Sequence, residues 1–298
     1  MADNYLDATA DTAWSTAGSW SLGTAPVDTE RVAIFDSNVN IAGSNEAATF
    51  TNGMAEFDIY HSYTGRIGSV GAGPPSSSFT YLTIEAILST IGKFTGMLPP
   101  MVGGSPRLML NYGAVATNIT VERTARVSAE SAYGLPPVRI LAVNSANVLN
   151  VWRGAVGVAV HTPFEASTFG TINIGNKSEE IIGGSEADVT VGAGVTLTTL
   201  NVNQGTGRVG CAFTTGNVMG GKLLLTGPGN ITTLNVRGFS NVIIAKSGGT
   251  ITTLTTDEGT SVDTSKSSAL TITNAALAKG TLKFSGNTTF TNPPSART

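Results

Sequence analysis

Several acidic residues in the second half of this sequence stand close enough together to act as a pair. They are Glu179, Glu180, Glu186, Asp188, Asp257, Glu258 and Asp263. Two carboxylates on either side of a glycosidic bond can hydrolyse a polysaccharide, one as the acid and the other as base or nucleophile. Most of these acids stand beside Gly, Ser or Thr in apparent turns, where solvated carboxylates are expected, and none has an evident partner that would shift its pKa. We therefore predict that none is catalytic and that the chain is not an enzyme.

The segment G-T-G-R-V-G at 205–210 matches the dinucleotide-binding pattern G-x-G-x-x-G. That pattern requires a helix next, so that backbone amides and the helix dipole meet the pyrophosphate. The following residues, CAFTTGNVMGG, are strand and turn material, and no Asp or Glu occurs between Gly205 and Asp257 to bind a ribose. We interpret the segment as a corner or an insertion loop of the fold.

The remaining reactive side chains predict neither a cofactor nor a metal site. The two histidines, His61 and His161, stand far apart in the sequence and are expected to be structural. Tyr60 and Tyr63 could stack a sugar, although capping of the core is the favoured interpretation. The single cysteine, Cys211, excludes an internal disulfide framework and a multi-cysteine zinc site, and is expected to be buried.

Charge is scarce in this chain. Charged residues make up 12% of it and the net charge is −3, against about 25% charged residues in ordinary globular proteins. Without clustered Lys and Arg, no nucleic-acid partner is expected. The amino terminus lacks the basic and apolar regions of a signal peptide, and no window approaches the roughly 18 apolar residues of a membrane span. We expect a protein that is made in the cytoplasm of its host.

Two repeated phrases organise the chain. LTTLNV at 197–202 returns as ITTLNV at 231–236 and ITTLTT at 251–256, and KLLLTG at 222–227 is echoed by NVIIAKSGG at 241–249 and TLKFSGN at 281–287. Ile231 and Ile251 are 20 residues apart, but 34 residues separate Leu197 from Ile231, which indicates an insertion of about 14 residues. Strand phrases recurring every 20 residues or so predict an all-β fold, a right-handed parallel β-helix with three short strands per turn.

Stacked turns place equivalent side chains above one another inside the helix. We expect Leu200, Leu234 and Leu254 to form one interior column and Val202 and Val236 another, as a core ladder that supplies most of the stability.

The ends of the chain need separate treatment, because the end of a solenoid exposes both core and strand edges. Trp14 and Trp20 are expected to cap the core at the amino-terminal end. The segment YLTIEAILSTIGKF at 81–94 is ambiguous between a short helix and two strands. We expect four regions: a polar arm (1–13), a cap with irregular β structure (14–135), the β-helix (136–290) and a tail with no partner strand (291–298).

Two segments, PPVRILAVNSANVLNVWRGAVGVAV at 136–160 and ADVTVGAGVTLTTLNVNQG at 187–205, resemble β-helical structural proteins of tailed bacteriophages and prophages. The opening W-S-L-G-T-A-P at 20–26 is similar to the first turn of many bacterial surface β-helices. The resemblance implies a virion component, often a homotrimer, and brings no catalytic residues with it.

The leading hypothesis is a non-enzymatic bacteriophage virion protein, a capsid decoration or cement protein that binds the major capsid protein or other virion proteins and stabilises the head lattice. A threonine-faced rod of low charge can lie on such a lattice without charge matching. The arm residues Asp3, Asn4, Tyr5 and Leu6 are expected to become ordered on a neighbouring subunit. The alternatives are a tailspike or receptor-binding protein that holds host glycan, and a polysaccharide lyase or hydrolase.

Overall fold

The chain forms a parallel β-helix, as the repeats predict. The computed structural model describes residues 2–27, 30–39, 41–42, 56–59, 69–72, 80–85, 93–97, 108–112, 118–123, 136, 138–160, 166–175, 186–278 and 281–296. It separates into two compact units, Met1–Gly157 and Val158–Thr298. Within the described residues the only helix is the short 3-10 turn η1 (Ala17–Ser19), and no helix there is long and apolar enough to cross a membrane.

The first unit contains two main sheets. The strands of one are β1 (Asp3–Tyr5), β3 (Arg31–Ile34), β5 (Glu56–Ile59), β8 (Lys93–Met97), β10 (Asn118–Arg123) and β12 (Val148–Val151). Those of the other are β6 (Ser69–Ala72), β7 (Thr80–Glu85), β9 (Leu108–Tyr112) and β11 (Val138–Ala142), with β13 (Gly154–Val158) at the unit boundary. Among the strand pairs described in this unit, β6 and β7 are antiparallel and the others are parallel. The ambiguous segment 81–94 therefore contributes strands at both ends, and its residues 86–92 lie outside the described residues.

The amino-terminal residues are part of the fold, so the expectation of a free arm is wrong. β1 pairs in register with β3, and Asn4 is fully buried although it is polar. Its Nδ2 donates hydrogen bonds to Glu30 Oε2 at 3.2 Å and to the Thr24 carbonyl oxygen at 3.1 Å. A buried amide with such partners is tolerated where an unsatisfied one is not. Leu6 is also buried and forms a bridge to Trp20.

Two tryptophans fill the interior of this amino-terminal region. Trp14 is fully buried and Trp20 nearly so, and their rings meet edge to face with centroids 4.8 Å apart. Trp20 Nε1 donates a hydrogen bond to the Trp14 carbonyl oxygen at 2.8 Å. A small third sheet, β2 (Thr12–Ala13) with β4 (Ile41–Ala42), lies in the same part of the chain. Both tryptophans that the sequence analysis expected to cap the core are therefore buried in this region.

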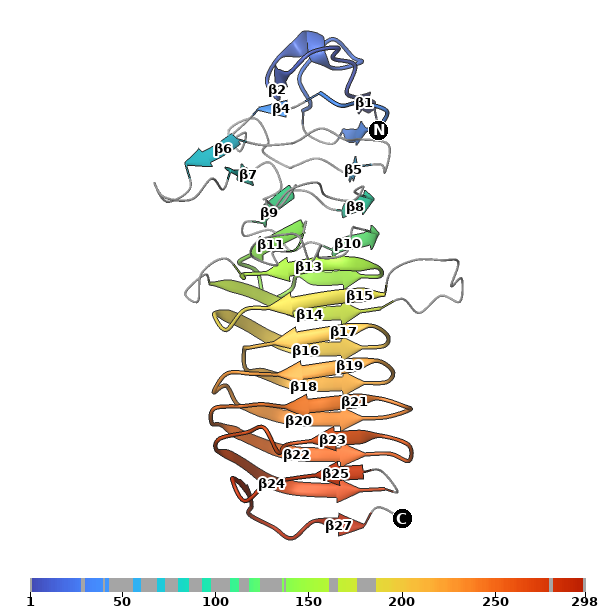
Figure 1. The fold of residues 1–298 in the computed structure, drawn as a ribbon. Helices are drawn as coiled ribbons and strands as arrows, with labels where there is room; N and C mark the ends of the chain where they lie inside the picture. The colour runs from blue at the N-terminus through green and yellow to red at the C-terminus, as the bar shows by residue number, and fades with distance from the viewer. Residues whose placement is uncertain are drawn as a thin grey trace. The chain divides into compact units, whose positions relative to one another are not determined.

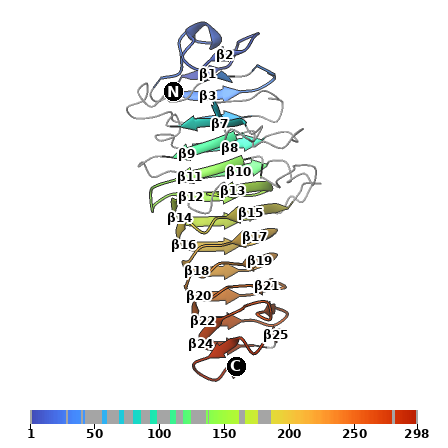
Figure 2. The same ribbon diagram turned by 60° about the vertical axis from the view of Figure 1, so that its left-hand side comes forward.

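The second unit is the more regular stack (Figures 1 and 2). Its longer strands are β14 (Ser167–Ile174), β16 (Val195–Val202), β18 (Phe213–Val218), β20 (Ile231–Val236), β22 (Thr250–Thr256) and β24 (Leu270–Leu277), and the short strand β26 (Thr288–Phe290) follows them in the same sheet. Its shorter strands are β15 (Ala187–Val191), β17 (Thr206–Val209), β19 (Lys222–Leu225), β21 (Asn241–Ile244), β23 (Ser261–Asp263) and β25 (Thr281–Lys283). Long and short strands alternate along the chain, so each turn adds one strand to each sheet.

Each long strand contains a break, a point at which the alternation of buried and outward side chains shifts by one position. A turn therefore has one long, bent strand and one short strand, where the sequence predicted three short strands. In β16 every second residue is buried up to Leu197, and the next buried residue is Leu200, three positions later. Since side chains alternate sides along a strand, this shift requires a local change of direction at Thr198–Thr199. β18, β20 and β22 show the same shift, which explains the recurring phrase with two aliphatic residues three apart.

The 34-residue gap between Leu197 and Ile231 is a complete extra turn, so the predicted insertion is wrong. Leu197 pairs with Phe213, and Phe213 pairs with Ile231, in turns of 16 and 18 residues. The sequence F-T-T-G-N-V of β18 is the missing copy of the repeated phrase. It went unrecognised because Gly216 occupies the position of the second aliphatic residue.

The core consists of files of side chains along the stack. The register places Leu200, Gly216, Leu234, Leu254 and Ala275 in one file. The next file contains Val202, Val218, Val236 and Thr256. The three leucines and the three valines are all fully buried. The residues expected as a core ladder therefore lie in two interior files, with Gly216 between Leu200 and Leu234.

Tight corners join consecutive strands, and each corner lies against the equivalent corner of the neighbouring turn. Gly221 has a φ of +98°, and a Cβ built there would lie 2.5 Å from the Gly205 carbonyl oxygen. Only glycine combines a positive φ with so close an approach of two backbones. At the carboxyl-terminal end, β27 (Ser295–Ala296) pairs with β24, so the expectation that the tail has no partner strand is wrong.

Candidate binding surface

Some of the acids considered for catalysis form ion pairs with basic residues of a neighbouring turn. Asp188 forms an ion pair with Arg208, and Asp263 Oδ2 lies 3.5 Å from Lys283 Nζ. Hydrogen bonds from Ser265, reinforced by Lys283, lower the pKa of Asp263. A carboxylate stabilised in this way is a poor proton donor, because general acids in hydrolases need a raised pKa. Glu179 and Glu180 lie outside the described residues.

The dinucleotide-like segment is part of the stack. Gly205 forms a corner, residues 206–209 are β17, and Cys211 follows in a buried position before β18. Burial raises the pKa of the Cys211 thiol to about 12, which makes it unreactive as a nucleophile. Lys246, also buried, has a pKa below its ordinary value because burial disfavours the ammonium ion.

The histidines and the tyrosine pair, Tyr60, Tyr63, His61 and His161, lie outside the described residues. Among the residues that the structure does describe, no group of three or more His, Cys, Asp or Glu side chains could hold a metal ion.

The outward side of the long-strand sheet forms what we call the Thr/Asn face. Three files of outward positions run along it: two are half-exposed, and the third, at the break in each strand, is exposed. The half-exposed files are Thr171, Thr199, Thr215, Thr233 and Thr253, and Asn173, Asn201, Asn217, Asn235 and Thr255. The exposed file is Thr198, Thr214, Thr232 and Thr252.

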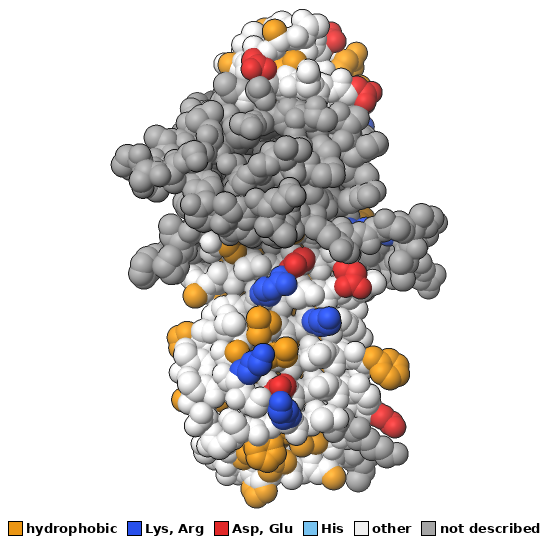
Figure 3. All heavy atoms as spheres, viewed as in Figure 1, with side chains coloured by type: hydrophobic (Ala, Val, Ile, Leu, Met, Phe, Trp, Pro, Cys, Tyr) orange, Lys and Arg blue, Asp and Glu red, His pale blue; other side chains and the backbone are white. Residues whose placement is uncertain are grey.

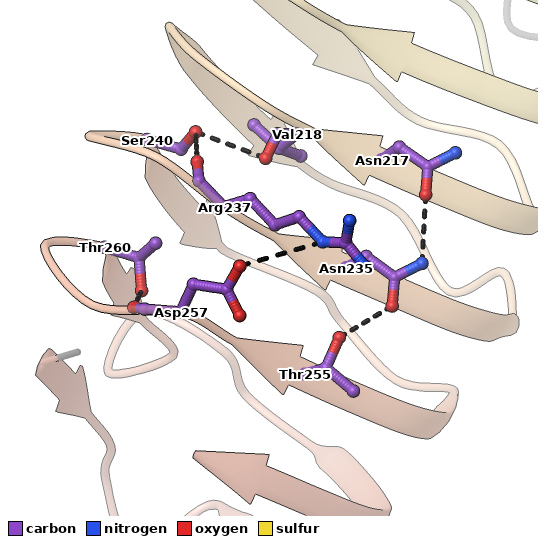
Figure 4. Close-up of polar contacts among 8 residues, drawn as sticks. All are labelled: Asn217, Val218, Asn235, Arg237, Ser240, Thr255, Asp257 and Thr260. Carbon is purple, nitrogen blue, oxygen red and sulfur yellow. Dashed lines mark hydrogen bonds and ion pairs between the residues drawn. The ribbon is translucent and has the colours of Figure 1, made fainter. Parts of the chain in front are cut away.

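Side-chain hydrogen bonds connect the second of these files from turn to turn. Asn201 Nδ2 donates to Asn173 Oδ1 at 2.7 Å, and Asn217 Nδ2 donates to Asn201 Oδ1 at 2.9 Å. The chain continues as Asn235 Nδ2 donates to Asn217 Oδ1 at 2.9 Å and the Thr255 hydroxyl donates to Asn235 Oδ1 at 2.6 Å (Figure 4). Each bond holds an amide in one orientation, so the face is ordered before anything binds to it.

The short-strand sheet has a different outward side. Its exposed and half-exposed positions include the ion pairs Arg208–Asp188 and Lys283–Asp263, with the aliphatic residue Leu224 on the strand next to Arg208. The view in Figure 3 shows lysine, arginine and acidic side chains gathered around a few hydrophobic ones on one side of this unit. The two sheets of one stack therefore offer one charged surface and one uncharged surface.

A corner at the end of β20 presents the most exposed large apolar side chain among the described residues. Phe239 is 94% exposed, and Met219, at the equivalent corner of the preceding turn, is 49% exposed. The two corners stack directly, because a Cβ built at Gly238 would lie 2.8 Å from the Met219 carbonyl oxygen. The Phe239 ring in turn lies over Gly259 of the following turn, where a built Cβ would come within 3.1 Å of it.

Several hydrogen bonds hold this corner in place (Figure 4). Arg237 N donates to the Val218 carbonyl oxygen at 2.7 Å, and the Ser240 hydroxyl contacts the carbonyl oxygens of Val218 and Arg237. Arg237 Nε lies 3.8 Å from Asp257 Oδ2. Phe239 therefore projects from a fixed backbone. Sequence reasoning missed it, although an aromatic residue in the turn R-G-F-S between two strands was a visible signal.

Comparisons with protein-family models, curated proteins and solved structures find no match for this chain.

Proposed function

We propose that this chain is a non-enzymatic structural protein of a tailed-bacteriophage virion, and specifically a capsid decoration or cement protein that binds the head lattice. The observation that carries the proposal is the corner formed by Met219 and Phe239. Large aromatic side chains that enter a partner's pocket dominate the energy of protein interfaces. A side chain on an ordered backbone also loses less conformational entropy on binding.

The remainder of the stack supports a holding role. Fully buried aliphatic files run along its interior, and the hydrogen-bonded ladder fixes its uncharged face. Such a stack presents an anchor at a defined position, which is what a protein that attaches to a lattice requires.

Immunogold labelling of purified virions tests the location. Label on the head supports the proposal, whereas label confined to the tail favours the receptor-binding alternative, and absence of label from particles overturns both.

The anchor itself is tested with recombinant protein added to virions. The double variant M219S/F239S is expected to lose occupancy roughly tenfold or more, because loss of a buried aromatic anchor commonly costs about 2 kcal/mol. The control is Val143→Ser, which changes another exposed apolar side chain, 59% exposed, at a different place in the fold. Equal occupancy of the double variant and the control would show that the corner is not the attachment point.

A further inference from the structure

The six long strands β14, β16, β18, β20, β22 and β24 contain no Asp, Glu, Lys or Arg. The outward positions of these strands are instead occupied mainly by Thr and Asn. In the adjacent sheet of the same unit, by contrast, β15, β17, β19, β23 and β25 each carry a charged residue. Solvation alone does not require this difference, since charged residues solvate the neighbouring sheet. It is the difference expected if the Thr/Asn face is covered, because burying a charge without a partner is costly.

The hydrogen-bonding groups on this face are self-complementary. A threonine hydroxyl and an asparagine amide each both donate and accept hydrogen bonds, so two copies of such a surface can satisfy one another. A surface of lysines or of carboxylates cannot, because it repels its own copy. Self-complementarity is the property that a two-fold interface between identical subunits requires, because the same patch of each copy meets that of the other.

The spacing of the groups points to the same partner. The files repeat at the distance between neighbouring strands, about 4.8 Å, over five consecutive turns. A partner that makes equivalent contacts along the whole face needs the same repeat, and a second copy of this chain has it by construction. A globular protein of unrelated fold lacks this repeat.

We infer that the Thr/Asn face packs side by side against other copies of this chain. A two-fold contact of this kind pairs two copies of the chain, and it leaves the Met219–Phe239 corner for a different partner. The inference extends the proposed function without depending on it, since self-association is measured with the purified chain alone.

Light scattering coupled to size-exclusion chromatography tests the inference on the full chain at micromolar concentration. The wild type is expected to elute with a mass that is a multiple of the chain mass. The variant T214K/T232K places two ammonium groups in the exposed file and is expected to weaken association roughly 100-fold and to elute as a monomer. The control N241K/T281K introduces the same charges at exposed positions of the other sheet and keeps the oligomer.

Cross-linking gives a second measurement that does not depend on the charged variant. The chain has one cysteine, Cys211, which is buried, so Thr232→Cys introduces the only accessible thiol. Oxidation is expected to produce a covalent dimer band from Thr232→Cys and none from Asn241→Cys. A monomeric wild type, an oligomer that survives T214K/T232K, or cross-linking through position 241 alone would each overturn the inference.

Discussion

The pair formed by Phe213 and Gly216 offers the most direct test of how the stack is packed. In the turns on either side, the equivalent positions hold two aliphatic residues, Leu197 with Leu200 and Ile231 with Leu234. In β18 the larger ring of Phe213 occupies the space that a side chain at 216 would fill. A Cβ built on Gly216 would lie 2.7 Å from Phe213 Cε2 and 3.0 Å from Leu234 Cδ1. The two residues therefore compensate for each other in volume.

The energies of the single variants follow from this geometry. Gly216→Leu overfills the core and is expected to cost about 3 kcal/mol, at the upper end for overpacking, because its first side-chain atom already collides with the ring. Phe213→Ile leaves a cavity and is expected to cost about 2 kcal/mol, less than the 3–5 kcal/mol of a full truncation to alanine. The double variant F213I/G216L recreates the Ile231/Leu234 pair of the next turn, so it is expected to cost only about 1 kcal/mol.

Urea unfolding followed by circular dichroism measures the three free energies of unfolding. The expected coupling is about 4 kcal/mol in favour of the double variant, which exceeds the usual 0.5–3 kcal/mol between neighbours because the clash is removed completely. Additivity of the two single variants to within about 0.5 kcal/mol would refute the compensation and the register on which it rests.

Three further predictions concern the ladder, a buried cation and the amino terminus. Asn217→Ala removes two hydrogen bonds, to Asn201 and from Asn235, and is expected to lower the free energy of unfolding by about 1–3 kcal/mol in urea titrations, against little change for Thr190→Ala on the other sheet. Lys246→Met is expected to stabilise the protein. Burial lowers the folded-state pKa of Lys246, so its penalty is largest at neutral pH and below and fades as pH rises toward 10.5; a gain independent of pH would contradict this cause. Deletion of residues 2–6 removes β1 and uncovers β3, so the melting temperature should fall in differential scanning calorimetry, whereas a free arm would leave it unchanged.

Part of the candidate binding surface could be predicted from the sequence, and part could not. Abundant threonine on an exposed strand face was visible in the composition, and the repeated T-T-L-N phrase contains the residues of the Thr/Asn face. Phe239 was not anticipated, because the exposure of a turn residue depends on which corners stack against it. The ion pair between Arg237 and Asp257 was equally invisible, since it joins residues on successive turns.

Periodicity within the chain was enough to establish the parallel β-helix and to bring Leu200, Leu234 and Leu254 into one interior file, because alternation along a strand and repetition at a near-constant interval are local properties. Four features depended on tertiary structure: the number of turns, the pairing of β1 with β3, the pairing of β27 with β24, and the burial of Asn4. In two of these cases a residue of the wrong local type is accommodated by its neighbours in the fold: Gly216 by the Phe213 ring of its own turn and Leu234 of the next, and Asn4 by Glu30. Local sequence patterns do not register such partners, since the stacked chain creates the space and the hydrogen bonds that make them acceptable.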